Sequence, residues 1–215
     1  MAWIDQLASA NWSQAAQYAL GAYILGCFTT GYYLVRMLQR EDIRALGSGN
    51  LGAKNVGRIL GWKGFTLTLL GDCGKGAFAV WTAQHFTKDA GPVAVALLAV
   101  VAGHVWPMQL RFHGGKGIAT SLGGLLVYDY HLAGAFLLLF GAGFVLMRGM
   151  VLPGLFAFVC LPWVSFYFGD EPPKVAAISV LAGLIFITHR RNLMEEISQF
   201  MERHNLRPKT NNREL

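Results

Sequence analysis

Long apolar segments follow one another through most of this chain, and they restrict it to very few folds. Each approaches the roughly 20 apolar residues that a helix needs to cross a bilayer. We read seven of them, at residues 17–35, 64–86, 91–110, 118–128, 132–147, 150–168 and 175–188. Backbone polar groups in hydrocarbon need partners within their own segment, so these segments are expected to be helical. The sequence therefore predicts an all-α integral membrane protein with seven transmembrane helices.

Composition agrees with this class and suggests one domain. Hydrophobic residues make up 54% and charged residues 14% of the 215 residues, whereas an average soluble domain has roughly 25% charged residues. We expect a single membrane domain, residues 1–215, with an external N-terminal segment (1–16), a helical core (17–192) and a basic cytoplasmic tail (193–215). The segments at 118–128 and 132–147 are short for a bilayer, so a five-span arrangement stays open.

Charge bias predicts the orientation of the chain. The first segment lacks the basic flank of a cleaved signal peptide, so we expect it to be retained. With the N-terminus outside, all of the 18 Lys and Arg residues lie on the cytoplasmic side except Lys75, Lys88 and Lys174. Cytoplasmic loops are enriched in such residues. The C-terminus is therefore expected in the cytoplasm, and the net charge of +6 reflects orientation and not nucleic-acid binding.

Four polar clusters then fall on the cytoplasmic side. They are residues 47–55, residues 111–120, Arg148 and residues 189–192, from four different connections. Their shared side predicts a single site.

The first cluster is a glycine-rich loop that suits an anion. Small residues allow backbone N–H groups to turn toward a ligand, and an arginine fork matches phosphate oxygens. The candidate ligand-binding residues are Ser48, Gly49, Asn50, Asn55 and Arg58. The simpler interpretation is an ordinary basic loop beside the membrane.

Asp72 and Lys75 place an acid and a base on one face of a helix within an apolar segment. Charges at such depth are costly and usually have a role. We expect an ion pair that orients Lys75 toward the site.

Two glycines, Gly114 and Gly115, precede Lys116 where a new helix is expected to start. A helix N-terminus favours negative charge, so this turn is a second candidate anion site. Its spacing differs from that of a nucleotide-binding P-loop, so ATP is not implied. His104, in an apolar helix nearby, is expected to be a satisfied structural histidine.

The last cluster, with His189 and Asn192, is expected to close the final helix. Its simpler interpretation is a cationic cap that complements the helix dipole. The three cysteines form no CxxC pair, so neither a disulfide framework nor a metal site is predicted.

Taken in order, these motifs resemble the bacterial membrane glycerol-3-phosphate acyltransferases of the PlsY type, which use acyl phosphate. The matching stretches are GSGNLGAKN at 47–55, DCGKG at 72–76, GHVWP at 103–107, GGKGIAT at 114–120 and HRRN at 189–192. The resemblance extends from about residue 26 to residue 192.

The resemblance implies transfer of a fatty acyl group from acyl phosphate to glycerol 3-phosphate, giving lysophosphatidic acid and phosphate without cofactor or metal. It implies a multi-pass protein of the bacterial inner membrane with its active site on the cytoplasmic face, and we favour a monomer. The implied catalytic residues are Lys116, Arg58, His189 and Asn192. Ser48, Gly49, Asn50, Asn55, Gly114 and Gly115 are implied to bind phosphate, with Asp72, Lys75, His104 and Arg148 in support.

Three features depart from the family pattern. Leu51 stands where proline is usual, Lys54 where threonine is common, and no serine follows Arg148 at 149–154. Because hydroxyl groups bind phosphate, a divergent paralogue with another acceptor is an alternative. A non-catalytic transporter of phosphorylated metabolites is a second alternative.

Overall fold

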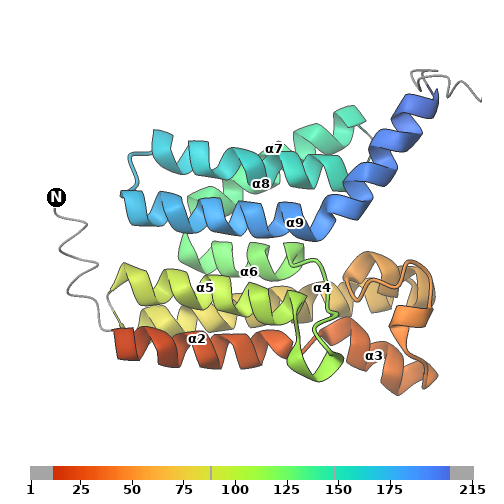
Figure 1. Cartoon of the computed structure of the whole chain (residues 1–215), viewed down its shortest axis with the longest axis horizontal. Helices are drawn as coiled ribbons and strands as arrows, with labels where there is room; N and C mark the ends of the chain where they lie inside the picture. The colour runs from red at the N-terminus through yellow and green to blue at the C-terminus, as the bar shows by residue number, and fades with distance from the viewer. Residues whose placement is uncertain (1–11, 88, 148, 204–215) are drawn as a thin grey trace, which may run out of the picture.

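The computed structural model describes residues 12–87, 89–147 and 149–203, and within these ranges it contains helices and no strand (Figure 1). The α-helices are α2 (Trp12–Cys27), α3 (Thr30–Gln39), α4 (Ala53–Phe86), α5 (Ala90–Val105), α6 (Ile118–Tyr128), α7 (Tyr130–Met147), α8 (Val151–Tyr167) and α9 (Pro172–Arg203). Two short 3-10 helices, η1 (Ile43–Ala45) and η2 (Met108–Leu110), lie in connections. The predicted all-helical class is confirmed.

The helices lie side by side in a bundle, with α2 packed on α5, α4 on α6, and α8 between α7 and α9. The short helix α6 lies between the group that contains α2, α4 and α5 and the group that contains α7, α8 and α9 (Figure 1). One end of the bundle gathers α3, the first turns of α4, the connection that contains η2 and the beginning of α6. The later turns of α9 leave the bundle at this same end (Figure 1).

The first expected segment, residues 17–35, is broken in the structure. Helix α2 ends at Cys27 and α3 begins at Thr30. Such a break leaves carbonyl groups at one helix end and N–H groups at the next without intrahelical partners. The Lys75 ammonium donates to two of these carbonyls, and the Asp72 carboxylate accepts the N–H of Thr30. Hydropathy alone could not reveal this break, because the partners come from another helix.

Helix α4 starts well before the expected segment at 64–86. Its backbone leaves helical geometry at Gly61, where φ is 72° and ψ is −168°, a conformation that favours glycine. The chain folds back there, so a Cβ added at Gly57 would lie 3.0 Å from the Cβ of Phe65. The first two turns of α4, residues 53–60, therefore stay near the end of the bundle where α3 begins.

Helix α7 is longer than expected, because Asp129 caps it. The carboxylate accepts hydrogen bonds from the backbone N–H groups of His131, at 2.8 Å, and Leu132, at 3.3 Å. Carboxylates are favoured at this position of a helix. The helix reaches 18 residues, enough to cross a membrane, so the prediction of a short segment at 132–147 is wrong. The other predicted short helix, α6, is confirmed with its expected bounds.

Two further helix ends differ from expectation. Helix α5 stops at Val105, since the residue before a proline, here Trp106, is disfavoured in helical geometry. Helix α9 continues to Arg203, so residues 189–192 lie inside a helix and do not close it. The predicted tail at 193–215 is thus helical as far as Arg203, and residues 204–215 lie outside the described part.

Three of the described helical segments are long and apolar enough to cross a membrane: Ala90–Leu110, Tyr130–Met147 and Pro172–Glu195. Helices α6 and α8 are apolar but shorter. Helix α4 carries charges at Lys63, Asp72 and Lys75. Large apolar side chains such as Leu138 (77% exposed) and Trp163 (73%) cover the outside of the bundle. Such a surface suits lipid and not water.

Glycines bring α4 and α6 into close contact. A Cβ added at Gly76 would collide with the backbone carbonyl of Thr120 and lie 3.0 Å from the backbone nitrogen of Gly124. A Cβ at Gly123 would likewise lie 2.7 Å from the Cα of Cys73. Small residues at membrane helix contacts allow such backbone approach. The position of α6, and of the loop before it, therefore depends on these glycines.

Replacing Gly76 with alanine is expected to destabilise the protein by about 1–3 kcal/mol, because the added methyl group meets immobile backbone atoms. Gly74→Ala is the matched control, since a Cβ at Gly74 meets nothing within 4 Å. This control should be neutral or stabilising by up to about 1 kcal/mol. Unfolding of both variants in mixed micelles, titrated with sodium dodecyl sulfate, measures the difference. Equal stability of the two variants would contradict this account of the α4–α6 contact.

Candidate active site

Lys116 and Asn192 meet at the end of the bundle where the polar clusters gather. The ammonium of Lys116 donates a hydrogen bond to Oδ1 of Asn192, and the hydroxyl of Thr188 donates to the backbone carbonyl of Lys116 at 3.0 Å. These contacts join the loop before α6 to a helix more than 70 residues further along the chain. The predicted convergence of these two motifs is therefore present. Thr188, which directly precedes His189, was not predicted as a site residue.

Lys116 is half-buried and lies near one acidic and one basic side chain. Burial lowers the pKa of its ammonium; Glu195 raises this pKa, and Lys54 lowers it further. Both neighbours therefore lie within electrostatic range of Lys116. Glu195 was not predicted, because the final helix was expected to end before it. Its spacing of three residues from Asn192 places both on one face of α9.

His189 lies one turn before Asn192 in α9 and is only 3% exposed. Its Nδ1 lies 2.9 Å from the backbone carbonyl of Ile185. The Thr188 hydroxyl also lies 3.1 Å from Nδ1. Because a carbonyl can only accept, the shorter contact with Ile185 assigns the proton to Nδ1 and leaves Nε2 of the neutral ring as an acceptor. The structure thus presents an imidazole that can accept a proton near Lys116. It contradicts the simpler interpretation of His189 as a helix cap.

The glycine-rich loop at 47–55 is organised by Asn55. Its Oδ1 accepts the N–H of Ser48 at 2.9 Å, and its Nδ2 donates to the carbonyls of Leu46 and Asn50, each at 3.0 Å. Asn55 is 1% exposed and its amide is fully engaged, so we expect it to shape the loop and not to contact a ligand.

The other polar side chains of this loop are available. The Ser48 hydroxyl and the Asn50 amide form no side-chain hydrogen bond within the described part of the chain. Gly47 and Gly49 have positive φ values of 57° and 70°, which turn the backbone there. A Cβ at Gly49 would lie 3.0 Å from the carbonyl of Arg44. This geometry suits glycine and leaves Ser48 exposed at the tip.

Lys54 and Arg58 lie four residues apart on the first turns of α4 and are both exposed. Residues at this spacing share one helix face. Neither side chain forms an ion pair with any residue that the structure describes. Within the described part of the chain, these two cations stand beside the glycine-rich loop without an ion-pair partner, so they can meet an anionic ligand.

Gly114 and Gly115, which were predicted to bind phosphate, use their backbone N–H groups within the protein. The N–H of Gly114 donates to the carbonyl of Val105, and the N–H of Gly115 donates to the carbonyl of His104, both at 3.0 Å. These donors hold the turn against the end of α5, so they are not free for phosphate. Gly117, with φ of 88°, is the N-cap of α6. The start of α6, beside the Lys116 side chain, keeps the favourable end of the helix dipole.

Asp72, Lys75 and His104 form a buried cluster. Nζ of Lys75 lies 3.2 Å from Oδ1 of Asp72 and donates to the carbonyls of Gly26 and Phe28, at 2.9 and 2.6 Å. It also lies 2.8 Å from Nδ1 of His104. The ion pair is confirmed, and His104 is buried with its Nδ1 in contact with the Lys75 ammonium. The expectation that Lys75 points toward the site is wrong, because its ammonium donates to two carbonyls at the helix break and to Nδ1 of His104.

The predicted supporting residue Arg148 lies outside the described residues. Among those described, no group of three or more His, Cys, Asp or Glu side chains could hold a metal ion.

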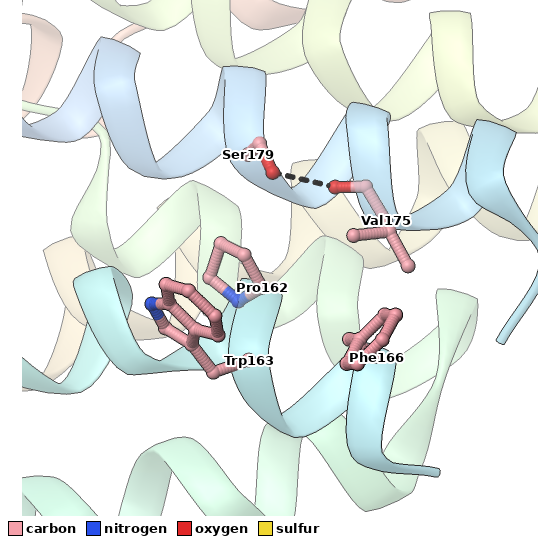
Figure 2. A pocket seen from close by; sticks show the side chains of 5 residues that line it. All are labelled: Pro162, Trp163, Phe166, Val175 and Ser179. Atoms are coloured by element: carbon pink, nitrogen blue, oxygen red, sulfur yellow. Dashed lines mark hydrogen bonds between the residues drawn. The ribbon is translucent and has the colours of Figure 1, made fainter. Parts of the chain in front are cut away.

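A separate apolar groove lies between α8 and α9 (Figure 2), near the start of α9. Figure 1 shows the start of α9 at the end of the bundle opposite the beginning of α6. The lining residues of the groove are Pro162, Trp163, Phe166, Val175 and Ser179. The hydroxyl of Ser179 donates to the carbonyl of Val175 at 2.8 Å, as Figure 2 shows. The groove thus offers no free charged group, and it suits hydrocarbon better than a phosphorylated ligand.

Comparison with known proteins gives a consistent result. The family model described as glycerol-3-phosphate acyltransferase matches residues 16–199. Glycerol-3-phosphate acyltransferase 1 of Desulfitobacterium hafniense is 45% identical over 184 residues, covering 86% of this chain and 91% of that protein. The enzyme of the same name from Bacillus anthracis is 40% identical over 173 residues, covering 80% and 92% of the two chains.

Two solved structures share the fold. They are crystal structures of PlsY, an integral membrane glycerol 3-phosphate acyltransferase, in a glycerol 3-phosphate form and a lysophosphatidic acid form. Their TM-scores are 0.79 and 0.78 and their identities 30% and 28%. Each alignment covers 86% of this chain and 92% of the other.

Proposed function

The chain belongs to the glycerol-3-phosphate acyltransferase family, and from that premise we propose that it moves a fatty acyl group from acyl phosphate to glycerol 3-phosphate. The products are 1-acylglycerol 3-phosphate and inorganic phosphate, the first step of phospholipid synthesis. The observation that carries this proposal is the contact of Lys116 with Asn192. This contact joins a half-buried cation to an amide one helical turn from the imidazole of His189, and it supports a reaction between two phosphorylated molecules.

In the proposed reaction, the 1-hydroxyl oxygen of glycerol 3-phosphate attacks the carbonyl carbon of the acyl phosphate. The bond between this carbon and the phosphate oxygen breaks, and phosphate leaves with the electron pair. Nε2 of His189 accepts the hydroxyl proton, which is a role suited to a neutral imidazole. Lys116 neutralises charge that develops on the carbonyl and phosphate oxygens, and such preorganised stabilisation is usually the largest contribution to catalysis.

The glycine-rich loop and the start of α4 are assigned to phosphate binding. Ser48, Gly49 and Asn50 supply hydrogen bonds, and Arg58 supplies a two-pronged donor for phosphate oxygens. Lys54 adds a second cation on the same helix face. Asn55 acts by holding the loop. In this proposal the amine of Lys54 replaces the phosphate donors that serines at 149–154 would supply.

The membrane setting follows from the charge distribution. The protein is an integral membrane protein, and we propose that the site end of the bundle faces the cytoplasm of a bacterial inner membrane. The cations of the connections at that end support this orientation. The acyl chain of the donor lies along the apolar helix surfaces, while its phosphate reaches the polar end. We favour a monomer with one membrane domain as the active form.

Phosphate release from palmitoyl phosphate by the purified protein, with and without glycerol 3-phosphate, tests the proposal. We expect release that depends on the acceptor, together with formation of lysophosphatidic acid detected by mass spectrometry. A folded protein that releases no phosphate with glycerol 3-phosphate, but does so with another phosphorylated alcohol, would replace the proposed acceptor. Absence of turnover with every acceptor would refute an acyltransferase function.

A further inference from the structure

We infer that His104 is a positioning residue for the catalytic lysine, and that the buried pair of Lys75 and Asp72 holds His104 in place for this purpose. The inference rests on the proposed role of Lys116, and it assigns a role to a buried cluster that the reaction itself does not use. Three steps connect the cluster to Lys116.

The first step fixes the imidazole of His104. Nζ of Lys75 lies 2.8 Å from Nδ1 of His104, and it also contacts the carbonyls of Gly26 and Phe28 and Oδ1 of Asp72. An ammonium can donate a hydrogen bond but cannot accept one. Nδ1 is therefore the acceptor nitrogen, and the ring proton is on Nε2. His104 is 2% exposed, so the ring has little freedom to leave this arrangement.

The second step is the contact between this ring and the glycine turn. A Cβ built on Gly115 would collide with Nε2 of His104 and would lie 2.7 Å from Cε1 and 3.0 Å from Cδ2. All three of its nearest atoms belong to the His104 ring. The backbone of Gly115 thus rests directly on the imidazole, and its N–H is bonded to the carbonyl of the same residue at 3.0 Å.

The third step leads to the lysine. Lys116 follows Gly115 directly, its carbonyl accepts the hydroxyl of Thr188, and its ammonium contacts Asn192. The turn therefore contacts α5 through Gly114 and Gly115, and it contacts α9 through Lys116. Without the ring beneath Gly115, the lysine keeps its partners in α9 but loses its support from α5. A misplacement of about 1 Å in a catalytic group can cost roughly a hundredfold in rate.

A steric rescue tests this inference. Gly115→Ala should lower kcat by roughly a hundredfold, because the methyl group lifts the turn off the ring. His104→Ala should lower kcat by about tenfold with little change in KM. The double variant should recover to the level of His104→Ala, since the methyl group then occupies the vacated space. Gly115 does not have a positive φ, so alanine is not excluded by its backbone.

Gly114→Ala is the matched control. A Cβ at Gly114 would meet the backbone carbonyls of His104 and Val105 and the ring of Pro107, none of which His104→Ala removes. The His104 substitution should therefore rescue Gly115→Ala and fail to rescue Gly114→Ala. Thermal unfolding and size-exclusion profiles identify any variant that does not fold.

Amide hydrogen exchange of the peptide spanning residues 108–118 supplies a readout independent of turnover. His104→Ala should speed exchange at this turn while helix α7 stays protected. If the wild-type protein shows no acyltransferase activity, the exchange measurement still tests whether His104 supports the turn. The proposed function and the proposed role of His104 can therefore fail separately. Equal impairment of Gly115→Ala with and without His104→Ala, or unchanged exchange in His104→Ala, would overturn the inference.

Discussion

Replacing Lys116 with alanine is expected to lower kcat for acyl transfer by about a hundredfold to a thousandfold, the range seen when one preorganised electrostatic contact is lost. The variant should remain folded, because Lys116 is only half-buried and its backbone carbonyl keeps the Thr188 hydroxyl. Steady-state phosphate release and thermal unfolding, measured on the same preparation, separate these effects. Lys63→Ala, at an exposed lysine, is the control and should keep wild-type turnover. Comparable activity of the Lys116 and Lys63 variants would remove Lys116 from the mechanism.

The pH dependence of turnover provides a further check on the same residue. Burial lowers the pKa of the Lys116 ammonium, with Glu195 opposing and Lys54 reinforcing that change. An ammonium is charged below its pKa, so activity should fall as the pH rises through a value below the ordinary lysine pKa of about 10.4. In Lys116→Arg the remaining activity should lose this alkaline decline, because a guanidinium stays protonated.

Replacing Lys75 with methionine is expected to destabilise the protein by about 3–5 kcal/mol, the usual consequence of removing one partner of a buried ion pair. The substitution leaves the Asp72 carboxylate, 1% exposed, without its counter-charge. It also leaves the carbonyls of Gly26 and Phe28, at the break between α2 and α3, without their donor. Unfolding in mixed micelles titrated with sodium dodecyl sulfate measures the loss.

A double-variant cycle tests whether the two charges act together. Asp72→Asn combined with Lys75→Met should be less destabilising than the sum of the single changes, since no buried charge then remains. The asparagine can still accept the N–H of Thr30. An interaction energy of about 0.5–3 kcal/mol is typical for groups in contact. Strict additivity, or a Lys75→Met variant as stable as Lys63→Met, would contradict the role of the pair at the helix break.

Sequence motifs predicted which residues gather at the site, but they did not predict the role of each residue. The convergence of Lys116 with His189 and Asn192 was predictable, because the charge bias placed both motifs on one side. Sequence patterns could not separate residues that face a ligand from residues that hold the backbone. Asn55, Gly114 and Gly115 stand in phosphate-binding patterns, yet their hydrogen-bonding groups are used within the protein. A polar group's role depends on its partner, and these partners lie up to 11 residues away along the chain or in another helix.

The sequence by itself determined the membrane class, the approximate order of the helices and the gathering of the polar motifs at one end of the bundle. Each of these properties is a sum over a stretch of sequence. Membrane insertion depends on the summed transfer free energy of about 20 residues, and orientation depends on the number of cations in a loop. The tertiary structure alone decided that residues 17–35 form two helices and that Lys75 serves their junction. A helix can end within an apolar segment only where distant groups satisfy its free carbonyls and N–H groups. Asp72, Lys75 and Gln109 supply those groups from other parts of the fold.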